Sequence, residues 1–365
     1  MKKNFLIFIP SIEDGGVEKN LFLLSNYLSN KIKNVEILTC NFNYKHFFKK
    51  EIKFIGTKSK FFFNKSRYIK YIICLLILIK RIIKDKNILI FAFQANIYAI
   101  IVAKIFKIKI ITRSNSAPQG WSKNFIKQAF FGFFLKKADS IIVNSINFKK
   151  EMDKKYKINT IFIYNPFEKN SIKKKINSKL NFKFFKKKDL KLITIGRLTD
   201  QKDHLTLLKA FSLVVKKRID VKLLIIGKGK LNNVIEDFIS ENNLHDNVML
   251  RGYIANPYKY LKVADIFVLS SKFEGLPNVL LEAQFLKRYI ISTDCPTGPS
   301  EILLNGKAGD MFKIGDYKRL ADLIMSYKFK NKKIKKMIKL ATANFHRFDF
   351  KINCNKYYEV INKHL

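Results

Sequence analysis

The chain has 365 residues, enough for two domains, and its apolar fraction of 48% can fill two hydrophobic cores. Lysine and arginine total 71 against 28 acidic residues. The resulting formal net charge of +43 predicts a polyanionic binding partner: nucleotide phosphates, anionic lipid or nucleic acid. The four cysteines stand far apart in the sequence without metal-binding spacing, which argues against a metal site and fits a reduced cytoplasm.

Two apolar runs invite comparison with membrane segments. The first, from Phe5 to Ile9, follows two lysines as in a signal peptide, but it is too short and no small-residue cleavage site follows. The second, from Tyr71 to Ile79, has nine residues, whereas a helix needs about 20 to span a bilayer. Neither run is therefore expected to cross a membrane.

The first half alternates short apolar runs with longer periodic segments. Residues 4–9 are expected to form a buried strand, followed by a loop with Gly15 and Gly16 and a helix from about 18 to 28. Paired glycines let a substrate approach the backbone closely, although they also suit a plain turn. Further strands are expected at 35–39, 88–93, 108–112 and 141–144, and helices at 66–84 and 97–106. This alternation predicts a parallel, doubly wound sheet.

Polar residues follow the strand expected at 108–112. Functional groups of doubly wound sheets gather at the carboxyl ends of the strands, so Arg113, Ser114 and Asn115 are candidates for a substrate cleft. Arg113 would bind an anionic group there or form a salt bridge at the end of the strand.

The middle of the chain is rich in Lys, Asn and Ser and contains two lysine triplets. We expect a basic, solvated linker at 169–189 between a first domain, 1–168, and a second domain, 190–346, with a C-terminal helix within 347–365. No helix-turn-helix, zinc or RNA-binding pattern accompanies the lysines, so no nucleic-acid partner is expected.

The second half opens with a strand expected at 192–195. Gly196 and Arg197 follow directly, and Lys202 comes five residues later, before a helix. Arginine can donate two parallel hydrogen bonds to a phosphate and lysine supplies a point charge, so both are candidates for holding a diphosphate. The next strands are expected at 223–226, 248–250 and 290–292, and the glycines at 227 and 229 are interpreted as a tight turn.

The clearest chemistry lies in residues 266–284. An apolar run at 266–269 predicts a buried strand, a glycine and proline loop follows, and Asn278 is expected to cap a helix. In a continuous helix Glu274 and Glu282 would be roughly 12 Å apart, beyond the ~5–9.5 Å of glycosidase pairs. We interpret them as separate acceptors for hydroxyl groups. The alternative is a helix glutamate favoured by the macrodipole and a solvated loop glutamate.

The segment from Glu274 to Glu282 resembles the E-x7-E signature of retaining glycosyltransferases of family 4, which have the GT-B fold. The Gly196, Arg197 and Lys202 spacing resembles the phosphate clamp of that family, and the loop from Asp294 to Glu301 resembles its donor-contacting loop. A histidine common in the family is replaced near Arg113, so no histidine role is assigned.

The resemblance implies two doubly wound, Rossmann-like domains that face each other across a cleft, with the terminal helix packed back toward the first domain. It implies transfer of a hexosyl or N-acetylhexosaminyl group from a UDP- or GDP-linked sugar to a glycan acceptor. The implied catalytic residues are Glu274, Arg197 and Lys202; the donor-binding residues are Gly15, Gly16, Gly196, Gly275, Leu276, Asn278, Glu282 and Glu301; the acceptor-side residues are Arg113, Ser114 and Asn115.

Metal independence is expected as well. No Asp-x-Asp occurs in the chain, so a positive pair must neutralise the leaving diphosphate, and neither a cofactor nor a metal is predicted. In enzymes of this kind the leaving phosphate is thought to assist deprotonation of the acceptor, so no strong side-chain base is required.

The predicted location is the cytoplasmic face of the inner membrane, as a peripheral enzyme. Residues 1–165 carry 31 basic and 9 acidic residues, and an apolar stripe in 66–86 has a basic rim. The stripe would equally suit a core helix. The rim comprises Arg67, Lys70, Lys80, Arg81, Lys84 and Lys86. Many members of the resembled family extend lipid-linked glycans, so the resemblance implies a lipid-linked glycan acceptor in bacterial capsule, lipopolysaccharide or glycoconjugate synthesis. The alternatives are a nucleotide-sugar epimerase or hydrolase of the same fold, and a non-catalytic basic protein that binds membranes or nucleic acid.

Overall fold

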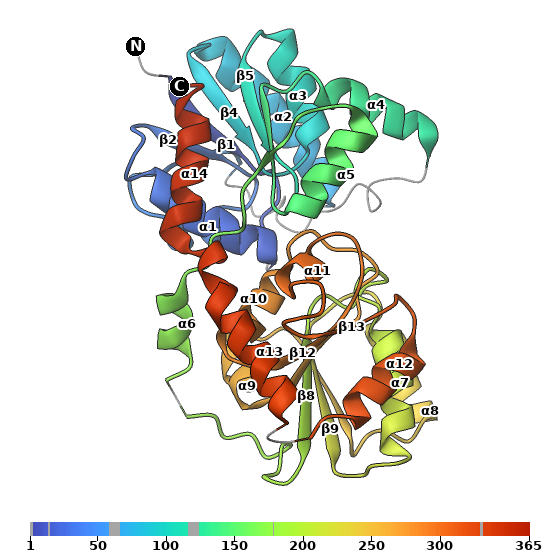
Figure 1. The fold of residues 1–365 in the computed structure, drawn as a ribbon. Helices are drawn as coiled ribbons and strands as arrows, with labels where there is room; N and C mark the ends of the chain where they lie inside the picture. Colours follow the sequence, from blue (N-terminus) through green and yellow to red (C-terminus); the bar gives the residue numbers. More distant parts are fainter. Residues whose placement is uncertain (1–2, 14, 58–65, 116–123, 178, 329–330) are drawn as a thin grey trace. The chain divides into compact units, whose positions relative to one another are not determined.

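The computed structural model describes residues 3–13, 15–57, 66–115, 124–177, 179–328 and 331–365. They divide into two compact units (Figure 1): Met1–Pro166 with Phe348–Leu365, and Phe167–Arg347. The second unit therefore includes residues 169–189, which were expected to form a linker, and these begin with a helix, α6 (Lys169–Lys175).

The first unit is built on a parallel sheet with the strand order β3-β2-β1-β4-β5-β6-β7 among its described residues. The strands are β1 (Asn4–Phe8), β2 (Val35–Leu38), β3 (Lys53–Ile55), β4 (Ile88–Ala92), β5 (Lys109–Arg113), β6 (Ser140–Val143) and β7 (Ile161–Phe162). The helices are α1 (Gly16–Leu28), α2 (Arg67–Lys84), α3 (Asn96–Ile105), α4 (Phe125–Leu135), α5 (Ile146–Tyr156) and α14 (Phe350–Asn362), with a 3-10 turn at Phe42–Phe47.

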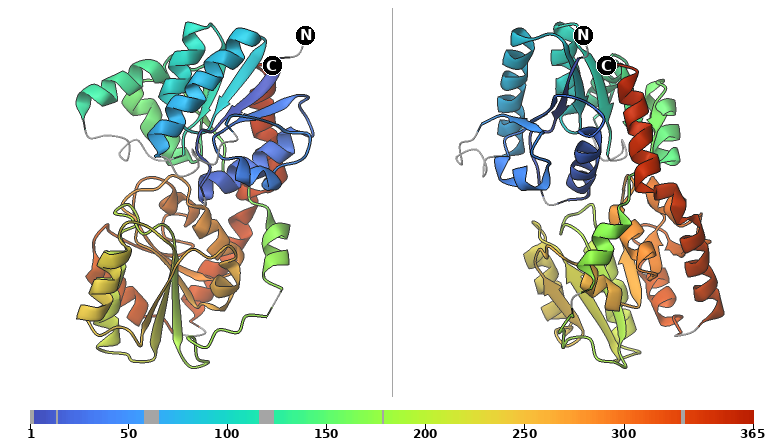
Figure 2. Two further views of the ribbon diagram at one scale, coloured as in Figure 1. Left: turned by 180° about the vertical axis from the view of Figure 1, so that it is seen from behind. Right: turned by 90° about the vertical axis from the view of Figure 1, so that its left-hand side faces the viewer.

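Both faces of this sheet are buried, as the unbroken apolar runs of its strands predict. Successive strand residues point to opposite faces, so Leu6 and Phe8 pack on one side while Phe5 and Ile7 pack on the other. Helices α2 to α5 cover the first side, and α1 and α14 cover the second (Figure 2). The C-terminal helix thus contributes to the core of the first unit.

Two cysteines that are distant in sequence meet in this core. The sulfur atoms of Cys40 and Cys74 lie 3.3 Å apart, and both residues are buried, free thiols. Cys40 follows β2 and Cys74 lies within α2, so only the packing of α2 on the sheet brings them together.

The second unit has a parallel sheet with the order β10-β9-β8-β11-β12-β13 among its described residues. The strands are β8 (Leu190–Ile195), β9 (Val221–Ile226), β10 (Val248–Arg251), β11 (Ile266–Leu269), β12 (Tyr289–Thr293) and β13 (Asp310–Phe312). Besides α6, the helices are α7 (His204–Val215), α8 (Asn232–Glu241), α9 (Tyr258–Val263), α10 (Asn278–Phe285), α11 (Gly298–Ile302), α12 (Tyr317–Met325) and α13 (Lys332–Ala343), before a 3-10 turn at Asn344–Phe348.

The two strand orders locate the edge where ligands are expected. In each sheet the order reverses once, between β1 and β4 in the first unit and between β8 and β11 in the second. Ligands of doubly wound folds bind outside the carboxyl ends of the strands at such a switch point. The loops after β1, β4, β8 and β11 are therefore the places to look for a site.

Candidate functional site

The switch point of the second unit holds a buried ion pair. Lys202 follows β8, Glu274 follows β11, and the Nζ of Lys202 donates to the Oε1 of Glu274 at 2.5 Å. The Oγ of Ser271 donates to the same oxygen at 2.6 Å. Only 15% of the lysine side chain and 8% of the glutamate side chain are exposed. A cation and a carboxylate are thus fixed together where this fold binds its ligands.

Three hydrogen bonds hold the loops after β8 and β11 against each other. Gln201 Nε2 donates to the carbonyl of Phe273 at 2.9 Å, and the N–H of Lys272 donates to the carbonyl of Gln201 at 2.8 Å. The Oγ of Ser270 donates to the carbonyl of Lys202 at 2.9 Å. The position of Lys202 is therefore set by the backbone as well as by its charge partner.

The loop after β12 is attached to the same place. The N–H of Glu274 donates to the carbonyl of Pro296 at 2.6 Å, and the N–H of Thr297 donates to the carbonyl of Glu274 at 3.1 Å. Gly298 then passes so close to Gly275 that an added Cβ would lie 2.0 Å from the Gly275 carbonyl oxygen. Three consecutive strands of the sheet, β8, β11 and β12, thus present one connected set of loops.

This contact gives a prediction for Gly298→Ala. The new methyl group must separate the two loops, so we expect a loss of about 1–3 kcal/mol of stability, typical of overpacking, and a fall in turnover. Gly252→Ala is the matched control, because no atom of the described residues lies within 4 Å of its added Cβ. Thermal unfolding of both variants is the measurement, and equal melting temperatures would show that the loops are not in contact.

Two titratable side chains beside the pair are held in their neutral forms. Burial, followed by the charge of Glu274, raises the pKa of Cys295 to about 12. Burial, followed by the charge of Lys202, lowers the pKa of His204 to about 4. At neutral pH Cys295 is therefore a thiol and His204 an uncharged imidazole, so neither supplies a nucleophile or a charge. Sequence reasoning assigned neither residue to the site, although Cys295 lies in the loop from Asp294 to Glu301 and His204 directly follows Lys202 and Asp203.

Arg197 stands apart from the ion pair. Its side chain is exposed, and within the described residues its guanidinium forms no hydrogen bond or ion pair. Gly196 packs on the stem of Lys202, since an added Cβ would lie 3.5 Å from the lysine Cδ and Cε. The structure thus brings Lys202 to Glu274 and leaves Arg197 at the surface.

The expected tight turn is present at the second of the next two glycines, since the N–H of Asn232 donates to the carbonyl of Gly229 at 3.2 Å. Both Gly227 and Gly229 are also needed because the loop after β8 passes over them. A Cβ added at Gly227 would lie 1.8 Å from the carbonyl oxygen of Gly196, and one added at Gly229 would lie 2.2 Å from that of Leu198. They allow close approach of two backbones at the candidate site.

Glu282 lies deeper than expected. It is the fifth residue of α10, it is 4% exposed, and its Oε1 accepts a hydrogen bond from the hydroxyl of Tyr258 at 3.3 Å. The capping role of Asn278 is wrong, because Pro277 occupies the N-cap position and Asn278 is the first helical residue. Gly275 and Leu276 are buried in the preceding loop, and Glu301 lies in α11.

The glycine loop of the first unit carries its own anion. Gly15 is the N-cap of α1, and an added Cβ there would lie 2.7 Å from Oε2 of Glu18, a buried residue. The other oxygen of Glu18 accepts a hydrogen bond from the N–H of Glu13 at 3.4 Å. A diphosphate placed directly on Gly15 and Gly16 would meet this carboxylate. Their role in donor binding stays a prediction.

Arg113 does not line a cleft, which corrects the expectation from sequence. The residue is only 1% exposed. Its Nε donates to the hydroxyl of Tyr357 at 2.9 Å, and its Nη2 donates to Oδ1 of Asn165 at 2.7 Å. Its Nη1 contacts Asn115. No carboxylate pairs with it among the described residues, so the expected salt bridge is absent as well. Arg113 attaches α14 to the sheet. Ser114 is buried too, and its Oγ has no hydrogen-bond partner among the residues that the structure describes.

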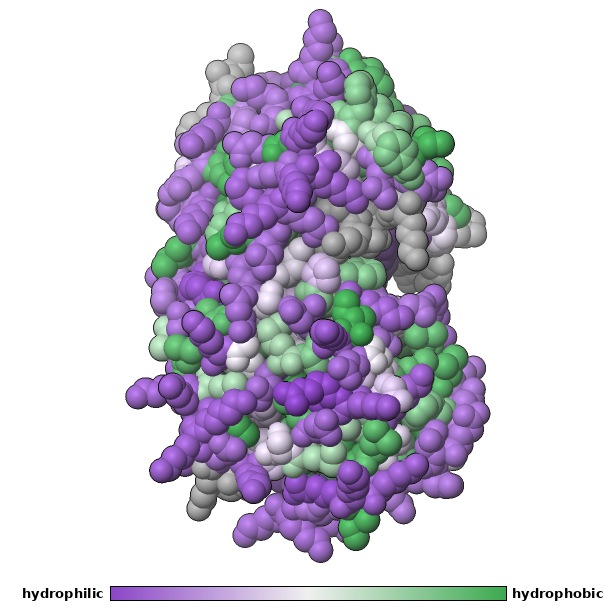
Figure 3. Space-filling view, turned by 45° about the vertical axis from the view of Figure 1, so that its right-hand side comes forward, coloured by the Kyte–Doolittle hydropathy of each residue, from purple (hydrophilic) through white to green (hydrophobic). Residues whose placement is uncertain are grey.

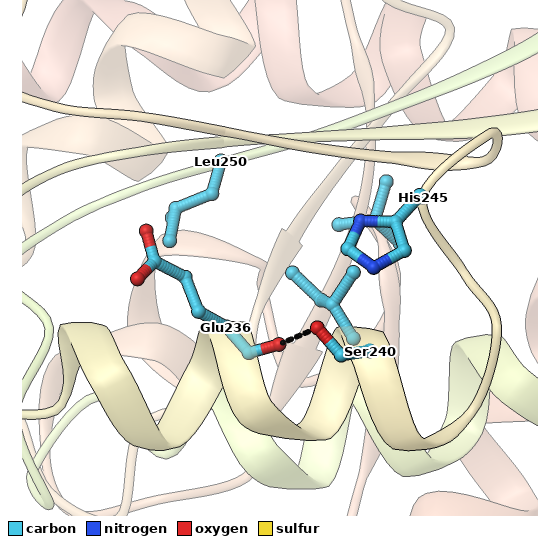
Figure 4. Close-up of a pocket in the computed structure, with 6 residues that line it drawn as sticks. Glu236, Ser240, His245 and Leu250 are labelled. Atoms are coloured by element: carbon cyan, nitrogen blue, oxygen red, sulfur yellow. Dashed lines mark hydrogen bonds between the residues drawn. The ribbon is translucent and has the colours of Figure 1, made fainter.

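A pocket at the far edge of the second sheet is separate from these loops. It lies between α8 and β10 and is lined by Glu236, Ile239, Ser240, His245, Val248 and Leu250 (Figure 4). The hydroxyl of Ser240 donates to the backbone carbonyl of Glu236 within its own helix. None of these residues belongs to the loops after β8, β11 or β12.

Comparison with known proteins shows which family and which fold the chain resembles. Residues 175–343 match the family described as Glycosyl transferases group 1, a range within the second unit. A crystal structure of the Anabaena protein HepE in complex with UDP and glucose superposes with a TM-score of 0.79 over 99% of this chain and all of that one, at 16% identity. The fold is that of GT-B glycosyltransferases. The predicted pair of Rossmann-like parallel-sheet domains is thereby confirmed.

Curated relatives point in the same direction. The chain is 36% identical over 217 residues to an uncharacterized glycosyltransferase of Methanocaldococcus jannaschii, covering 56% of this chain and 53% of that protein. It is 26% identical over 227 residues to the Campylobacter jejuni N-acetylgalactosamine-N,N'-diacetylbacillosaminyl-diphospho-undecaprenol 4-alpha-N-acetylgalactosaminyltransferase, covering 60% of each. The chain thus matches only about half to three-fifths of the length of these relatives. The matches support a glycosyltransferase as the class of enzyme.

The region matched by the family holds most of the residues assembled above. Arg197, Lys202, Glu274 and Glu282 all lie within 175–343, whereas Gly15, Gly16 and Arg113 lie outside it. The glycosyltransferase match and the geometry therefore agree on the second unit as the part that carries the candidate site.

Proposed function

We propose that the protein is a retaining glycosyltransferase of family 4 that transfers a sugar from a UDP- or GDP-linked donor to a hydroxyl of a glycan. The observation that carries the proposal is the Lys202–Glu274 pair at the switch point of the second sheet. Departure of a nucleoside diphosphate builds negative charge on the phosphate oxygens, and a positioned cation stabilises that charge in the transition state.

Each residue has a part in this reaction. Lys202 supplies a fixed charge to the leaving diphosphate, and Glu274 both holds the lysine and accepts a hydrogen bond from the donor sugar. Arg197, whose guanidinium is exposed and unpaired in the described structure, supplies a second cation for the phosphates. Glu282 accepts hydrogen bonds from the ribose hydroxyls. With Cys295 and His204 neutral, the leaving phosphate itself receives the acceptor's proton.

The acceptor is proposed to be a lipid-linked glycan in the synthesis of a bacterial polysaccharide or glycoconjugate. The Campylobacter relative is named for a diphospho-undecaprenol substrate, which supports this choice. The large basic excess of residues 1–165 supports a peripheral position on the cytoplasmic face of the inner membrane. Among the described residues, no helix combines the length and the apolar character that crossing a bilayer requires.

The proposal is tested by incubating the protein with a panel of nucleotide sugars, with and without a glycan acceptor. We expect one donor to be consumed faster with acceptor present, and NMR of the product should show the anomeric configuration of the donor. Consumption without transfer would indicate a hydrolase, a new nucleotide sugar would indicate an epimerase, and an inverted product would contradict retention.

Metal removal gives a separate prediction. Since Lys202 and Arg197 are proposed to neutralise the diphosphate, EDTA should leave the initial rate within about twofold of the untreated enzyme. The rate is measured before and after dialysis against the chelator. Loss of most activity, with recovery on adding Mg²⁺ or Mn²⁺, would show that a metal ion performs the role assigned to these cations.

A further inference from the structure

Exposed apolar side chains are concentrated on three neighbouring helices of the first unit. Of the nineteen large hydrophobic residues that are exposed in the described structure, eleven lie on α2, α3 and α4. They are Tyr68, Ile69, Ile72, Leu76 and Ile83 on α2, Tyr98 and Ile105 on α3, and Phe125, Ile126, Phe130 and Phe133 on α4. We call this surface the α2–α4 face. Figure 3 shows apolar side chains gathered at the upper right, over α4.

These helices belong together because they cover the same side of the sheet. Helix α3 contacts both α2 and α4, and all three contribute to one core cluster. Helix α2 buries Cys74, Leu78 and Ile82 in that cluster. Because an α-helix turns 100° per residue, its five exposed apolar side chains lie within an arc of roughly 100° on a different side of the helix. A helix needs only one apolar stripe to pack in a soluble domain, so the second stripe is not required for packing within the described part of this unit.

Helix α4 repeats this arrangement with aromatic side chains. Gly132 and Leu135 are buried, whereas Phe125 is 82% exposed, Ile126 77% and Phe133 59%. Exposure of this degree on consecutive turns is a feature of helices that lie in a membrane interface. Sequence reasoning placed the membrane-facing stripe only on 66–86 and did not identify α4.

The charged residues around this face indicate that its binding partner is anionic. Residues 52–138 contain 15 lysines and 3 arginines but a single acidic residue, Asp85. Asp85 is already engaged by Asn4 and Arg81. The exposed cations that border the face are Lys80, Lys84, Lys107, Lys127, Lys136 and Lys137. An apolar face bordered by lysines and almost free of carboxylates complements a surface with anionic headgroups above an apolar layer.

The structure also corrects the basic rim expected from the sequence. Lys70 is buried, Arg67 pairs with Glu13 at 2.8 Å, and Arg81 pairs with Glu36 at 2.9 Å. The cations left to meet a partner are therefore the lysines near the ends of α2, α3 and α4. A second copy of the chain would bring these lysines against one another, and nucleic acid would leave the apolar side chains in water.

We propose that the α2–α4 face binds the surface of an anionic lipid bilayer, with the aromatic side chains of α4 inserted among the lipids. This inference rests on the peripheral location proposed above and not on the proposed reaction. It names the surface that would hold the first unit at the bilayer, where a lipid-linked acceptor would be met.

Flotation with liposomes tests the surface with the full-length chain. Wild type should float with phosphatidylcholine–phosphatidylglycerol 7:3 vesicles at low salt, bind pure phosphatidylcholine at least tenfold more weakly, and be released by high salt. The variant F125S/I126S/F130S should lose at least tenfold in partitioning. The control I219S/I352S removes exposed isoleucines elsewhere, 85% and 52% exposed, and should float like wild type.

A fluorescent dye attached at one position tests whether that position contacts the lipids, whatever the overall affinity of the protein for the vesicles. The four native cysteines are buried, so a cysteine introduced at an exposed position is the one that an environment-sensitive dye labels. The dye on Phe130→Cys should brighten and shift to the blue on adding the anionic vesicles, and the dye on Ile219→Cys should not.

The proposal is overturned if wild type fails to float at low salt, or if the α4 variant floats as wild type does. It is also overturned if wild type is a dimer without lipid that the α4 variant converts to a monomer, because the face would then be a protein interface. Donor hydrolysis in lipid-free buffer is measured for every variant. Normal hydrolysis with lost flotation supports the surface, and absent hydrolysis with normal flotation contradicts only the proposed reaction.

Discussion

Replacing Lys202 by alanine is expected to lower kcat/KM by roughly 30- to 1,000-fold, because about 2–4 kcal/mol of transition-state stabilisation is lost with one electrostatic contact. The same change should destabilise the second unit. Glu274 would stay buried beside Ser271 without its cation, and breaking a buried pair costs about 3–5 kcal/mol. Activity is measured with the identified donor and stability by thermal unfolding.

Two further variants separate the chemical from the structural effect. Arg197→Ala should lose activity on a similar scale with an unchanged melting temperature, since the side chain is exposed. Lys202→Met combined with Glu274→Gln removes both charges and should recover stability without recovering activity. Activity within threefold of wild type in both single variants would refute the assignment of Lys202 and Arg197 to the diphosphate.

The two glutamates are expected to act at different steps. Glu274→Ala should lower kcat by about 100-fold or more, because its partners are the reacting sugar and Lys202. Glu282→Gln should weaken nucleotide binding about fivefold, because an ionised acceptor contributes about 1 kcal/mol more than a neutral amide. Calorimetry with the free nucleoside diphosphate distinguishes them, since only Glu282→Gln should change the affinity greatly.

Tyr258→Phe is the control for Glu282. It removes the hydrogen bond that the Tyr258 hydroxyl donates to Glu282, and it leaves the carboxylate of Glu282 in place. We expect a smaller loss of nucleotide affinity than with Glu282→Gln. Equal weakening of nucleotide affinity by Glu274→Ala and Glu282→Gln would contradict the division between sugar and ribose.

The fold could be predicted from the sequence where one local property decides it. Strand β11 was expected at 266–269 and has the same bounds, because an unbroken apolar run suits a strand buried on both faces. Helix α4 was not predicted from the sequence, because its run of phenylalanines lacks the polar face by which an amphipathic helix is recognised. Several of its apolar side chains are exposed at the surface of the unit, and helix packing alone would not require them to be apolar.

The site was predictable as a set of residues but not as a geometry. Lys202 and Glu274 are separated by 72 residues, and they meet only because β8 and β11 are neighbours in the sheet. Arg113 was assigned to a cleft, but Tyr357, 244 residues further on, holds it in the core. The carboxylate of Glu18 lies beside Gly15, in the loop that was expected to bind the donor. Each of these outcomes depends on long-range contacts that spacing in the sequence does not contain.

The return of α14 to the first unit determines the order in which the chain can complete its folding on the ribosome. Residues 348–365 leave the ribosome after all of the second unit, which is one continuous segment, Phe167–Arg347. Until then the first sheet lacks Cys354, Tyr357 and Ile361 on one face, and Arg113 lacks its phenol partner. Domains usually complete in order from the N-terminus during synthesis. Here the later segment can close first, and a fragment ending at Pro166 would expose the face that α14 covers.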